Sequence, residues 1–327
     1  MAAAVIRPMV SAVFVAIVSD MKAVRIHSFG GSDVLQVEEV ATPKPGPGEV
    51  LVKVRAASVN PVDFKIRSGQ HRSTNQKTPM TLGRDISGTV AAVGPDVKGV
   101  KEGDEVFALL DWNHGGNAEF AIVKVDGIVP KPSSLDHPHA AAVPLAAITA
   151  WQGLFDHGKL KAGERVLIHG AAGGVGHFAV QFAKERGATV IVTAKAEDMD
   201  FLGKLGADEV IDYKKERFED KVRDVDLVLD LIAGDTQQRS WKVLKPGGRL
   251  VSALGSPRED EARKHNAVGK GFMAEPNREE LQRIGKLIDD RKVKVMVQKT
   301  MPLSQVRAAH DHLENDHIQG KVVLTVA

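Results

Sequence analysis

A glycine-rich loop between an apolar strand and a helix restricts the fold of this chain more than any other segment. Residues 165–170 read Arg-Val-Leu-Ile-His-Gly, and residues 171–176 continue as Ala-Ala-Gly-Gly-Val-Gly before a helical pattern begins. Because glycine has no Cβ, the backbone can turn tightly and approach a phosphate closely. The start of the helix adds N–H groups that have no partner within the helix. The loop therefore predicts a site for the pyrophosphate of a dinucleotide, with the spacing Gly170, Gly173, Gly176 instead of the usual G-x-G-x-x-G.

Around this loop, apolar strands alternate with helices. Strands that are apolar along their whole length belong to a parallel sheet covered by helices on both faces. The chain is therefore predicted to be an α/β protein in which residues 148–275 form a doubly wound, cofactor-binding domain of the Rossmann type. We expect its strands at 165–170, 189–194, 209–213, 226–232 and 248–255, and its helices at 176–186, 198–205, 218–223 and 236–244.

Residues 21–147 are predicted to form a second, mainly β domain. Its strands are short, and a compact barrel lets short strands avoid open edges. We expect them at 23–27, 35–40, 49–57, 88–93, 105–109 and 118–123. An alanine-rich helix at 140–155, interrupted at Pro144, leads out of this domain. Beyond a polar stretch at 256–270, we expect strands at 270–274, 293–299 and 321–326 and helices at 277–291 and 303–315.

Residues 1–20 precede both predicted domains. They contain an apolar run of about ten residues, whereas a membrane-spanning helix needs about twenty. No clear cleavage site precedes Met21, where the first strand-like pattern begins. We therefore interpret residues 1–20 as an N-terminal extension and expect no membrane span. A cytoplasmic location is the default expectation, and targeting to an organelle or for export by this extension stays open.

The chain contains no cysteine and carries a net charge of +2. The lack of cysteine excludes disulfides, thiolate nucleophiles, iron–sulfur clusters and cysteine-ligated zinc. The histidines offer no convincing replacement, because His310 and His312 diverge on a predicted helix and His137 and His139 flank a proline. We therefore expect no metal site. The balanced charge gives no reason to expect a nucleic-acid partner.

The end of the second strand in the doubly wound domain predicts which cofactor binds. Sites that prefer NAD carry a carboxylate there, which accepts a hydrogen bond from the 2′-hydroxyl of the adenosine ribose. This chain instead reads Val-Thr-Ala-Lys-Ala at 192–196. Lys195 would attract a 2′-phosphate, although Glu197 and Asp198 follow closely. We therefore expect Lys195 to contact the cofactor, and we expect that cofactor to be NADPH.

Several motifs in a fixed order give the chain a resemblance to a known family. They are AASVNPVDFK at 56–65, LGRDISG at 82–88, GDEV at 103–106, the glycine loop, GADEVIDY at 206–213 and KPGG at 245–248. From Met21 to Ala327 the chain resembles the zinc-free medium-chain dehydrogenases/reductases of the quinone oxidoreductase type, in the NADPH:quinone and alkenal/enone reductase branch. The resemblance implies a homodimer. It also implies that residues 21–147, completed by 276–327, form a GroES-like β-barrel catalytic domain, with the active site between this domain and the Rossmann domain.

A zinc-free member of this family implies hydride transfer to a carbon that is already electrophilic. Quinones and α,β-unsaturated carbonyls meet this requirement, since hydrogen-bond donors or water suffice to stabilise the developing enolate. The expected protein is an NADPH-dependent reductase of such small molecules. Two alternatives stay open: an enoyl-thioester reductase, and an NADPH-binding protein without catalytic importance, as in the lens crystallins of this family.

The resemblance also implies the residues of the active site. In the segment after a barrel strand, which we expect to be a turn, Asn60 and Lys65 would contact the substrate or the nicotinamide ribose, and Asp63 would hold Lys65 or the turn. A Cβ at Gly174 is expected to occupy the space of the pyrophosphate. The other cofactor residues implied are Gly173, Val175 and Gly176 at the pyrophosphate, Tyr213 at the adenosine phosphate, and Thr149, Leu254, Phe272 and Lys321 around the nicotinamide.

Overall fold

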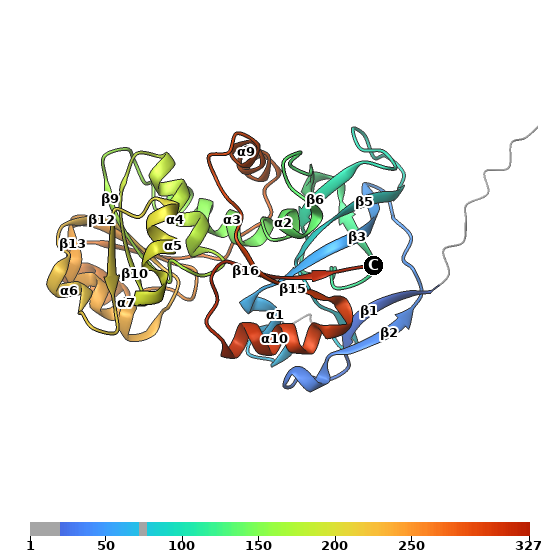
Figure 1. Ribbon diagram of the computed structural model, residues 1–327, viewed down its shortest axis with the longest axis horizontal. Helices are drawn as coiled ribbons and strands as arrows, with labels where there is room; N and C mark the ends of the chain where they lie inside the picture. The colour runs from blue at the N-terminus through green and yellow to red at the C-terminus, as the bar shows by residue number, and fades with distance from the viewer. Residues whose placement is uncertain (1–19, 72–76) are drawn as a thin grey trace, which may run out of the picture.

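The computed structural model describes residues 20–71 and 77–327. All but the last residue of the predicted extension, 1–20, therefore lies outside the described residues. Two β-rich bodies lie at opposite ends of the molecule, and helix α3 (Pro144–Trp151) lies between them (Figure 1). Within the described ranges, every helix is too short or too polar to span a bilayer.

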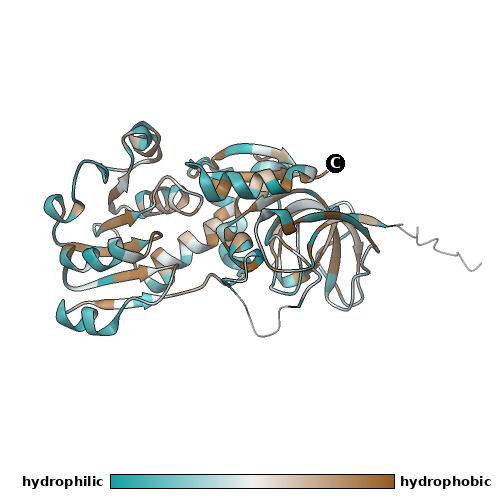
Figure 2. Cartoon of the chain, turned by 90° about the horizontal axis from the view of Figure 1, so that it is seen from below, coloured by the Kyte–Doolittle hydropathy of each residue, from teal (hydrophilic) through white to brown (hydrophobic). Residues whose placement is uncertain are grey.

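The first body is built on a six-stranded sheet of parallel strands in the order β11-β10-β9-β12-β13-β14. This is the strand order of a Rossmann domain, whose ligands bind where the order reverses, here between β9 and β12. Figure 2 shows hydrophobic residues along the strands and hydrophilic residues on the helices outside them. The strands are β9 (Arg165–His169), β10 (Thr189–Ala194), β11 (Glu209–Asp212), β12 (Val225–Asp230), β13 (Leu244–Ser252) and β14 (Val268–Gly271). The helices are α4 (Gly176–Glu185), α5 (Met199–Leu205), α6 (Phe218–Lys221), α7 (Gly234–Ser240) and α8 (Glu259–Lys264).

The second body is the GroES-like barrel, made of one sheet in the order β2-β1-β4 and another in the order β15-β16-β3-β5-β6-β8, with β7 paired to β3. The strands that come first in the chain are β1 (Met21–Ile26), β2 (Gln36–Val40), β3 (Glu49–Val59), β4 (Met80–Thr81), β5 (Asp85–Val93), β6 (Glu105–Leu109), β7 (Phe120–Lys124) and β8 (Ile128–Pro130). The last two are β15 (Val297–Pro302) and β16 (Lys321–Thr325). The helices on this side are α1 (Pro61–Arg67), α2 (His137–Ala141), α9 (Arg278–Asp289) and α10 (Val306–Asn315).

The C-terminal part of the chain completes the barrel. Strand β16 pairs antiparallel with β3, so that Val323 lies opposite Ser58, although 265 positions separate them in the sequence. Strand β15 continues the sheet beyond β16. We propose the predicted division into 21–147 with 276–327, and 148–275, as the domain organisation.

Some predicted elements differ from the structure. The single helix at 140–155 is wrong: α2, α3 and a π-helical turn (Gln152–His157) take its place, and Pro144 at the start of α3 causes the break. The polar stretch at 256–270, for which we predicted no helix, contains α8. The strand expected at 293–299 begins four residues later, at Val297.

The segment that precedes β15 is hydrogen-bonded to helix α4 of the Rossmann domain. Gln181 on α4 binds Lys294 twice, accepting from its N–H at 2.7 Å and donating to its carbonyl at 3.0 Å. His177, one turn earlier, accepts from the N–H of Met296 at 3.4 Å. Burial lowers the pKa of His177 to about 4, so the ring is neutral and can accept this bond. These contacts fix the path by which residues 294–296 return to the barrel.

Candidate active site

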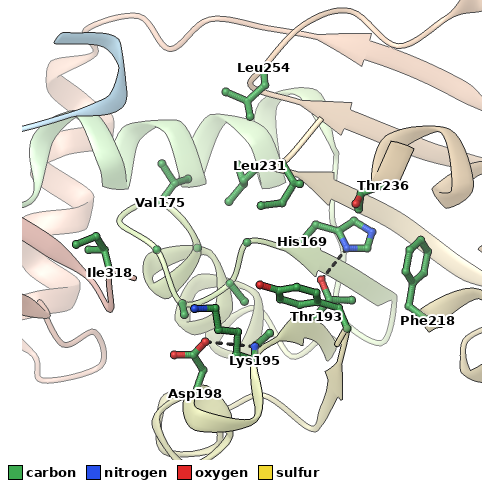
Figure 3. A pocket seen from close by; sticks show the side chains of 18 of the residues that line it. His169, Val175, Thr193, Lys195, Asp198, Phe218, Leu231, Thr236, Leu254 and Ile318 are labelled. Carbon is green, nitrogen blue, oxygen red and sulfur yellow. Dashed lines mark hydrogen bonds between the residues drawn. The ribbon is translucent and has the colours of Figure 1, made fainter. Parts of the chain in front are cut away.

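A groove lies over the carboxyl ends of β9 and β10, where Figure 3 shows side chains converging from several elements. Its cavity has a volume of about 530 Å³. The glycine loop 170–176 forms one wall, and the ends of β10 and β11 form another. This is the point at which the strand order reverses, which is the expected place for a dinucleotide.

The glycine loop is a tight turn that leaves two backbone N–H groups without a backbone acceptor among the described residues. Gly170 has a φ of +76°, which favours glycine. A Cβ at Gly176 would collide with the carbonyl oxygen of Gly170 and would lie 2.5 Å from the Cα of Ala171. Gly173 donates to the carbonyl of Gly170 at 3.3 Å, whereas the N–H groups of Gly174 and Val175 have no backbone acceptor among the described residues. The two free donors at the start of α4 fit a pyrophosphate.

The far end of the groove carries mixed charges. Lys195 follows β10, and its Nζ lies 3.3 Å from Oε1 of Glu197. Tyr213, the predicted neighbour of the adenosine phosphate, lines the same groove and is 47% exposed. Both residues therefore lie where the sequence places the adenosine end of the cofactor.

A second cavity, of about 470 Å³, opens between the two domains. Lys65 and His71 come to it from the barrel side, and residues 253–256 and 271–273 come from the Rossmann side. Leu254 lines both this cleft and the groove, so the two cavities are adjacent. Phe272 lines the cleft and packs against His157, with ring centroids 4.7 Å apart.

The segment expected to be a turn after β3 is the helix α1, which is a correction of the prediction. Asn60 is its N-cap, Pro61 occupies its first position, and Asp63 accepts a hydrogen bond from the N–H of Asn60 at 2.8 Å. These are the standard signals for the start of a helix. The helix places Lys65 in the wall of the cleft.

A buried polar network lies beneath α1. Asp85 accepts hydrogen bonds from the Ser58 hydroxyl at 2.6 Å, from Nδ2 of Asn60 at 2.8 Å and from the N–H of Leu145 at 2.7 Å. Lys321 donates to Oδ1 of Asn60 at 2.5 Å and to the carbonyl of Val59 at 3.3 Å. Asn60 is therefore held at both ends of its amide. The network joins β3, β5, α1, α3 and β16.

Two ionisable groups of this network have shifted pKa values. Burial raises the pKa of Asp63 to about 7, against the hydrogen bond from Asn60, and the nearby charge of Asp85 adds to the increase. Oδ1 of Asp63 has no hydrogen-bond partner among the described residues. Burial lowers the pKa of Lys321, while the charges of Asp85 and Asp63 oppose that change. Asp63 is thus poised to gain or lose a proton near neutrality.

Lys321 also contacts the cofactor loop. A Cβ at Gly174 would lie 2.8 Å from Cδ of Lys321 and 3.5 Å from the carbonyl oxygen of Gly320. The first atoms that such a Cβ meets are therefore protein atoms, whereas the sequence led us to expect the space of the pyrophosphate. Gly320 itself donates to the carbonyl of Ala172 at 2.9 Å. Strand β16 thus begins directly against the glycine loop.

Thr149 lies apart from both cavities. It is 7% exposed, and its hydroxyl donates to the carbonyl of Leu145 at 2.6 Å within α3. It is absent from the described walls of the groove and of the cleft. The other residues implied by the resemblance all lie in one of the two walls or in the buried network.

Sequence reasoning placed Lys321 near the cofactor but missed the contribution of residues 317–320, which we name the crossing segment. His317 and Ile318 line the groove, although they belong to the connection between α10 and β16. Asp198 is 1% exposed and accepts hydrogen bonds from His317 and Gln319, each at 2.8 Å. No local motif signals this contact, because the partners are more than a hundred residues apart.

Comparisons with known proteins agree with this architecture. Residues 46–133 match the family described as alcohol dehydrogenase GroES-like domain, and residues 205–324 match the zinc-binding dehydrogenase family. In the part of the chain that the structure describes, no three His, Asp or Glu side chains are grouped so that they could hold a metal ion.

Individual relatives cover nearly the whole chain. The 2-methylene-furan-3-one reductase of Solanum lycopersicum is 36% identical over 322 residues, which cover 95% of this chain and 80% of that protein. The chloroplastic NADPH-dependent alkenal/one oxidoreductase of Arabidopsis thaliana is 36% identical over 317 residues, covering 93% and 79%. The solved structure of the quinone oxidoreductase from Coxiella burnetii superposes with a TM-score of 0.88 at 36% identity, covering 94% of this chain and all of that one.

The fold and the site define a medium-chain dehydrogenase/reductase, with a Rossmann domain inserted in a GroES-like barrel. Within that class, the chain belongs to the quinone oxidoreductase-like family.

Proposed function

We propose that the protein is an NADPH-dependent reductase that transfers hydride to quinones or α,β-unsaturated carbonyls without the help of a catalytic metal. One observation carries the proposal. The groove that fits a dinucleotide, with Lys195 directly after β10 in its wall, adjoins a cleft lined by Lys65 and apolar side chains. The names of the relatives, which include an NADPH-dependent alkenal/one oxidoreductase and a quinone oxidoreductase, support it.

The chain's own residues fit the cofactor. The free N–H groups of Gly174 and Val175 would hold the pyrophosphate, and Lys195 and Tyr213 would hold the adenosine end. When bound, the nicotinamide supplies a hydride. Leu254, which lines both cavities, would separate the cofactor from solvent at the point where the groove meets the cleft.

Lys65 would supply the positive charge that the reaction requires on the substrate side. Hydride transfer to an enone or a quinone puts negative charge on the carbonyl oxygen, and a nearby ammonium group stabilises that charge. His71 and Phe272 offer ring surfaces in the same cleft for a flat, conjugated substrate. The proton that completes the product comes from solvent.

Asn60 and Asp63 would act by position. Because both ends of the Asn60 amide are bonded to Asp85 and Lys321, we assign Asn60 to holding α1 and thereby Lys65. Asp63 caps the same helix. We also propose the homodimer that the family implies, which sedimentation would test.

The experiment is a measurement of NADPH oxidation with 1,4-benzoquinone, 9,10-phenanthrenequinone, acrolein, cyclohexenone and an enoyl-thioester. Turnover with quinones or enones supports the proposal, turnover with the thioester alone supports an enoyl-thioester reductase, and cofactor binding without any turnover supports a non-catalytic protein. In Lys65→Met, kcat/KM should fall about ten- to a hundredfold because a charge contact to the developing oxyanion is lost. Lys98→Met, at an exposed position on a barrel loop, should leave kcat/KM unchanged.

A further inference from the structure

At the adenosine end of the groove, two basic side chains share one carboxylate oxygen. Oε1 of Glu197 lies 3.3 Å from Nζ of Lys195 and 3.5 Å from Nε2 of His317. Lys195 comes from the Rossmann domain, and His317 comes from the crossing segment at the start of β16. All three residues are partly exposed, and the two basic side chains line the groove.

His317 is held in this position from behind. Its Nε2 lies 2.8 Å from Oδ1 of Asp198, and that carboxylate is almost fully buried. Gln319 donates to the same oxygen at 2.8 Å, which fixes the crossing segment against β10 and α5. The buried Asp198 carboxylate therefore holds the His317 imidazole in the groove wall, where the imidazole also faces the carboxylate of Glu197.

The two arginines of the groove wall are already paired with carboxylates. Arg217 donates to Glu219 through two nitrogens, at 3.0 and 2.8 Å. Arg239 binds Glu219 at 2.8 Å and Asp235 at 2.7 Å. By contrast, Glu197 is 60% exposed and lies at longer distances from its two partners. A weak, exposed ion pair is easily exchanged for a stronger anion.

We propose that Lys195 and His317 together bind the 2′-phosphate of NADPH, and that the Glu197 carboxylate occupies their site until the phosphate displaces it. This inference rests on the proposed function, because it names the residues that select the cofactor of that reaction. His317 is then a specificity-determining residue supplied by the catalytic domain, and the cofactor site is complete only when the crossing segment is in place.

The test separates binding from turnover. Adenosine 2′,5′-bisphosphate and 5′-AMP are titrated against the purified full chain by calorimetry, since the two probes differ only in the 2′-phosphate. The wild type should bind the bisphosphate at least about tenfold more tightly, which corresponds to one charge-assisted contact or more. His317→Gln keeps a donor toward Asp198 but removes the imidazole that faces the Glu197 carboxylate, and it should reduce that preference about three- to tenfold with the affinity for 5′-AMP unchanged.

Glu197→Gln should change the affinity for the bisphosphate in the opposite direction. Glu197 is exposed, so this substitution should not affect folding. Removing the competing carboxylate should raise the affinity for the bisphosphate about two- to fivefold and leave 5′-AMP unaffected. His312→Gln is the matched control, because His312 pairs with Asp316 in a similar way on α10, away from the groove. It should change neither affinity.

Each outcome decides between the two proposals. If His317→Gln weakens both probes equally or neither, or if Glu197→Gln weakens the bisphosphate, the assignment of the 2′-phosphate site is overturned. If the wild type prefers the bisphosphate with the expected variant effects but oxidises NADPH with no quinone or enone, the site stands and the proposed reaction fails. If the wild type prefers 5′-AMP yet turns over NADH, the reductase proposal survives only for the other cofactor and this inference falls.

Discussion

Replacing Gly174 with alanine should destabilise the protein, whereas the same change at Gly173 should not. The two glycines are neighbours in the cofactor loop, which makes them a matched pair. A Cβ at Gly174 would lie 2.8 Å from Cδ of Lys321, whereas a Cβ at Gly173 would meet only the carbonyl oxygen of Gly170, at an ordinary 3.6 Å. The consequences therefore depend on whether Lys321 can move.

The magnitude follows from how Lys321 is held. Carbon atoms in contact are normally about 3.5–4.0 Å apart, so the side chain must shift by roughly 0.7 Å or more. Its ammonium group is fixed at Asn60 and Val59 in a fully buried network, and such a shift weakens those hydrogen bonds. Overpacking and the loss of a charged hydrogen bond together cost about 2–4 kcal/mol. At about 2–4 °C per kcal/mol, the melting temperature should fall by roughly 5–15 °C.

The assay is a thermal melt of each variant together with a titration of NADPH fluorescence. Gly173→Ala should melt within about 2 °C of the wild type. Gly174→Val, which the sequence alone predicts to lose cofactor binding more than folding, should lose both. In a Lys321→Ala background, the substitution Gly174→Ala should become nearly neutral, because the clashing side chain is gone. Equal melting of Gly174→Ala and the wild type, or no rescue by Lys321→Ala, would refute the reasoning.

Three further outcomes are expected. Lys195→Ala should raise KM for NADPH about five- to thirtyfold, less than a fully buried contact because the lysine is partly exposed, and should leave KM for NADH within about twofold; equal losses for both cofactors would contradict the assignment. Since the pKa of Asp63 rises to about 7 on folding, stability due to the protonated acid is present below about pH 4 and is lost as the pH rises through about 7. The melting temperature of Asp63→Asn, relative to the wild type, should therefore be higher at pH 8.5 than at pH 5.5, and an unchanged difference would argue against a buried neutral acid. Elemental analysis of the purified protein should find less than about 0.1 equivalent of zinc, with activity unchanged by chelators, because no thiolate site exists.

The Rossmann sheet could be predicted from the sequence because its signals are local. Each strand is an apolar run of strand length, each helix follows within a few residues, and the glycine loop marks the first unit. The predicted limits of β10 are the observed ones, and those of β9 and β11 differ by a single residue at one end. In this fold class the strand order reverses between the first and fourth strands, here β9 and β12, and the groove lies at that point.

Helix α1 shows where local reasoning failed although the signals were present. Asn60 followed by Pro61 predicts a turn when it is read by itself, because both residues favour turns. The same residues, with Asp63 three positions after the cap, also form the start of a helix. The difference matters for function, since only a helix brings Lys65 into the wall of the cleft while Asp63 caps it from below.

The buried network could not be predicted, because it depends on contacts between distant segments. Lys321 reaches Asn60 across 261 positions of sequence, and His317 reaches Asp198 across 119. Neither pair has a spacing that a motif could encode. The resemblance to the family did place Lys321 near the cofactor, but it gave no indication that the ammonium group donates to Asn60 and Val59 in a buried network.

These contacts restrict where substrate specificity can reside. In the cofactor loop, Ala172 accepts a hydrogen bond from Gly320, and Gly174 lies against the side chain of Lys321. Lys321 in turn donates to Asn60 at the start of α1. The loop and α1 therefore cannot separate without breaking buried hydrogen bonds. The backbone of α1, which carries Lys65, is therefore held in place relative to the glycine loop. The cleft residues outside this network, His71 on the barrel side and Met273 on the Rossmann side, are free to differ in size and chemistry without disturbing it. Under the proposed function, substitutions there should change which quinone or enone is reduced, whereas substitutions in the network should change kcat/KM for all of them.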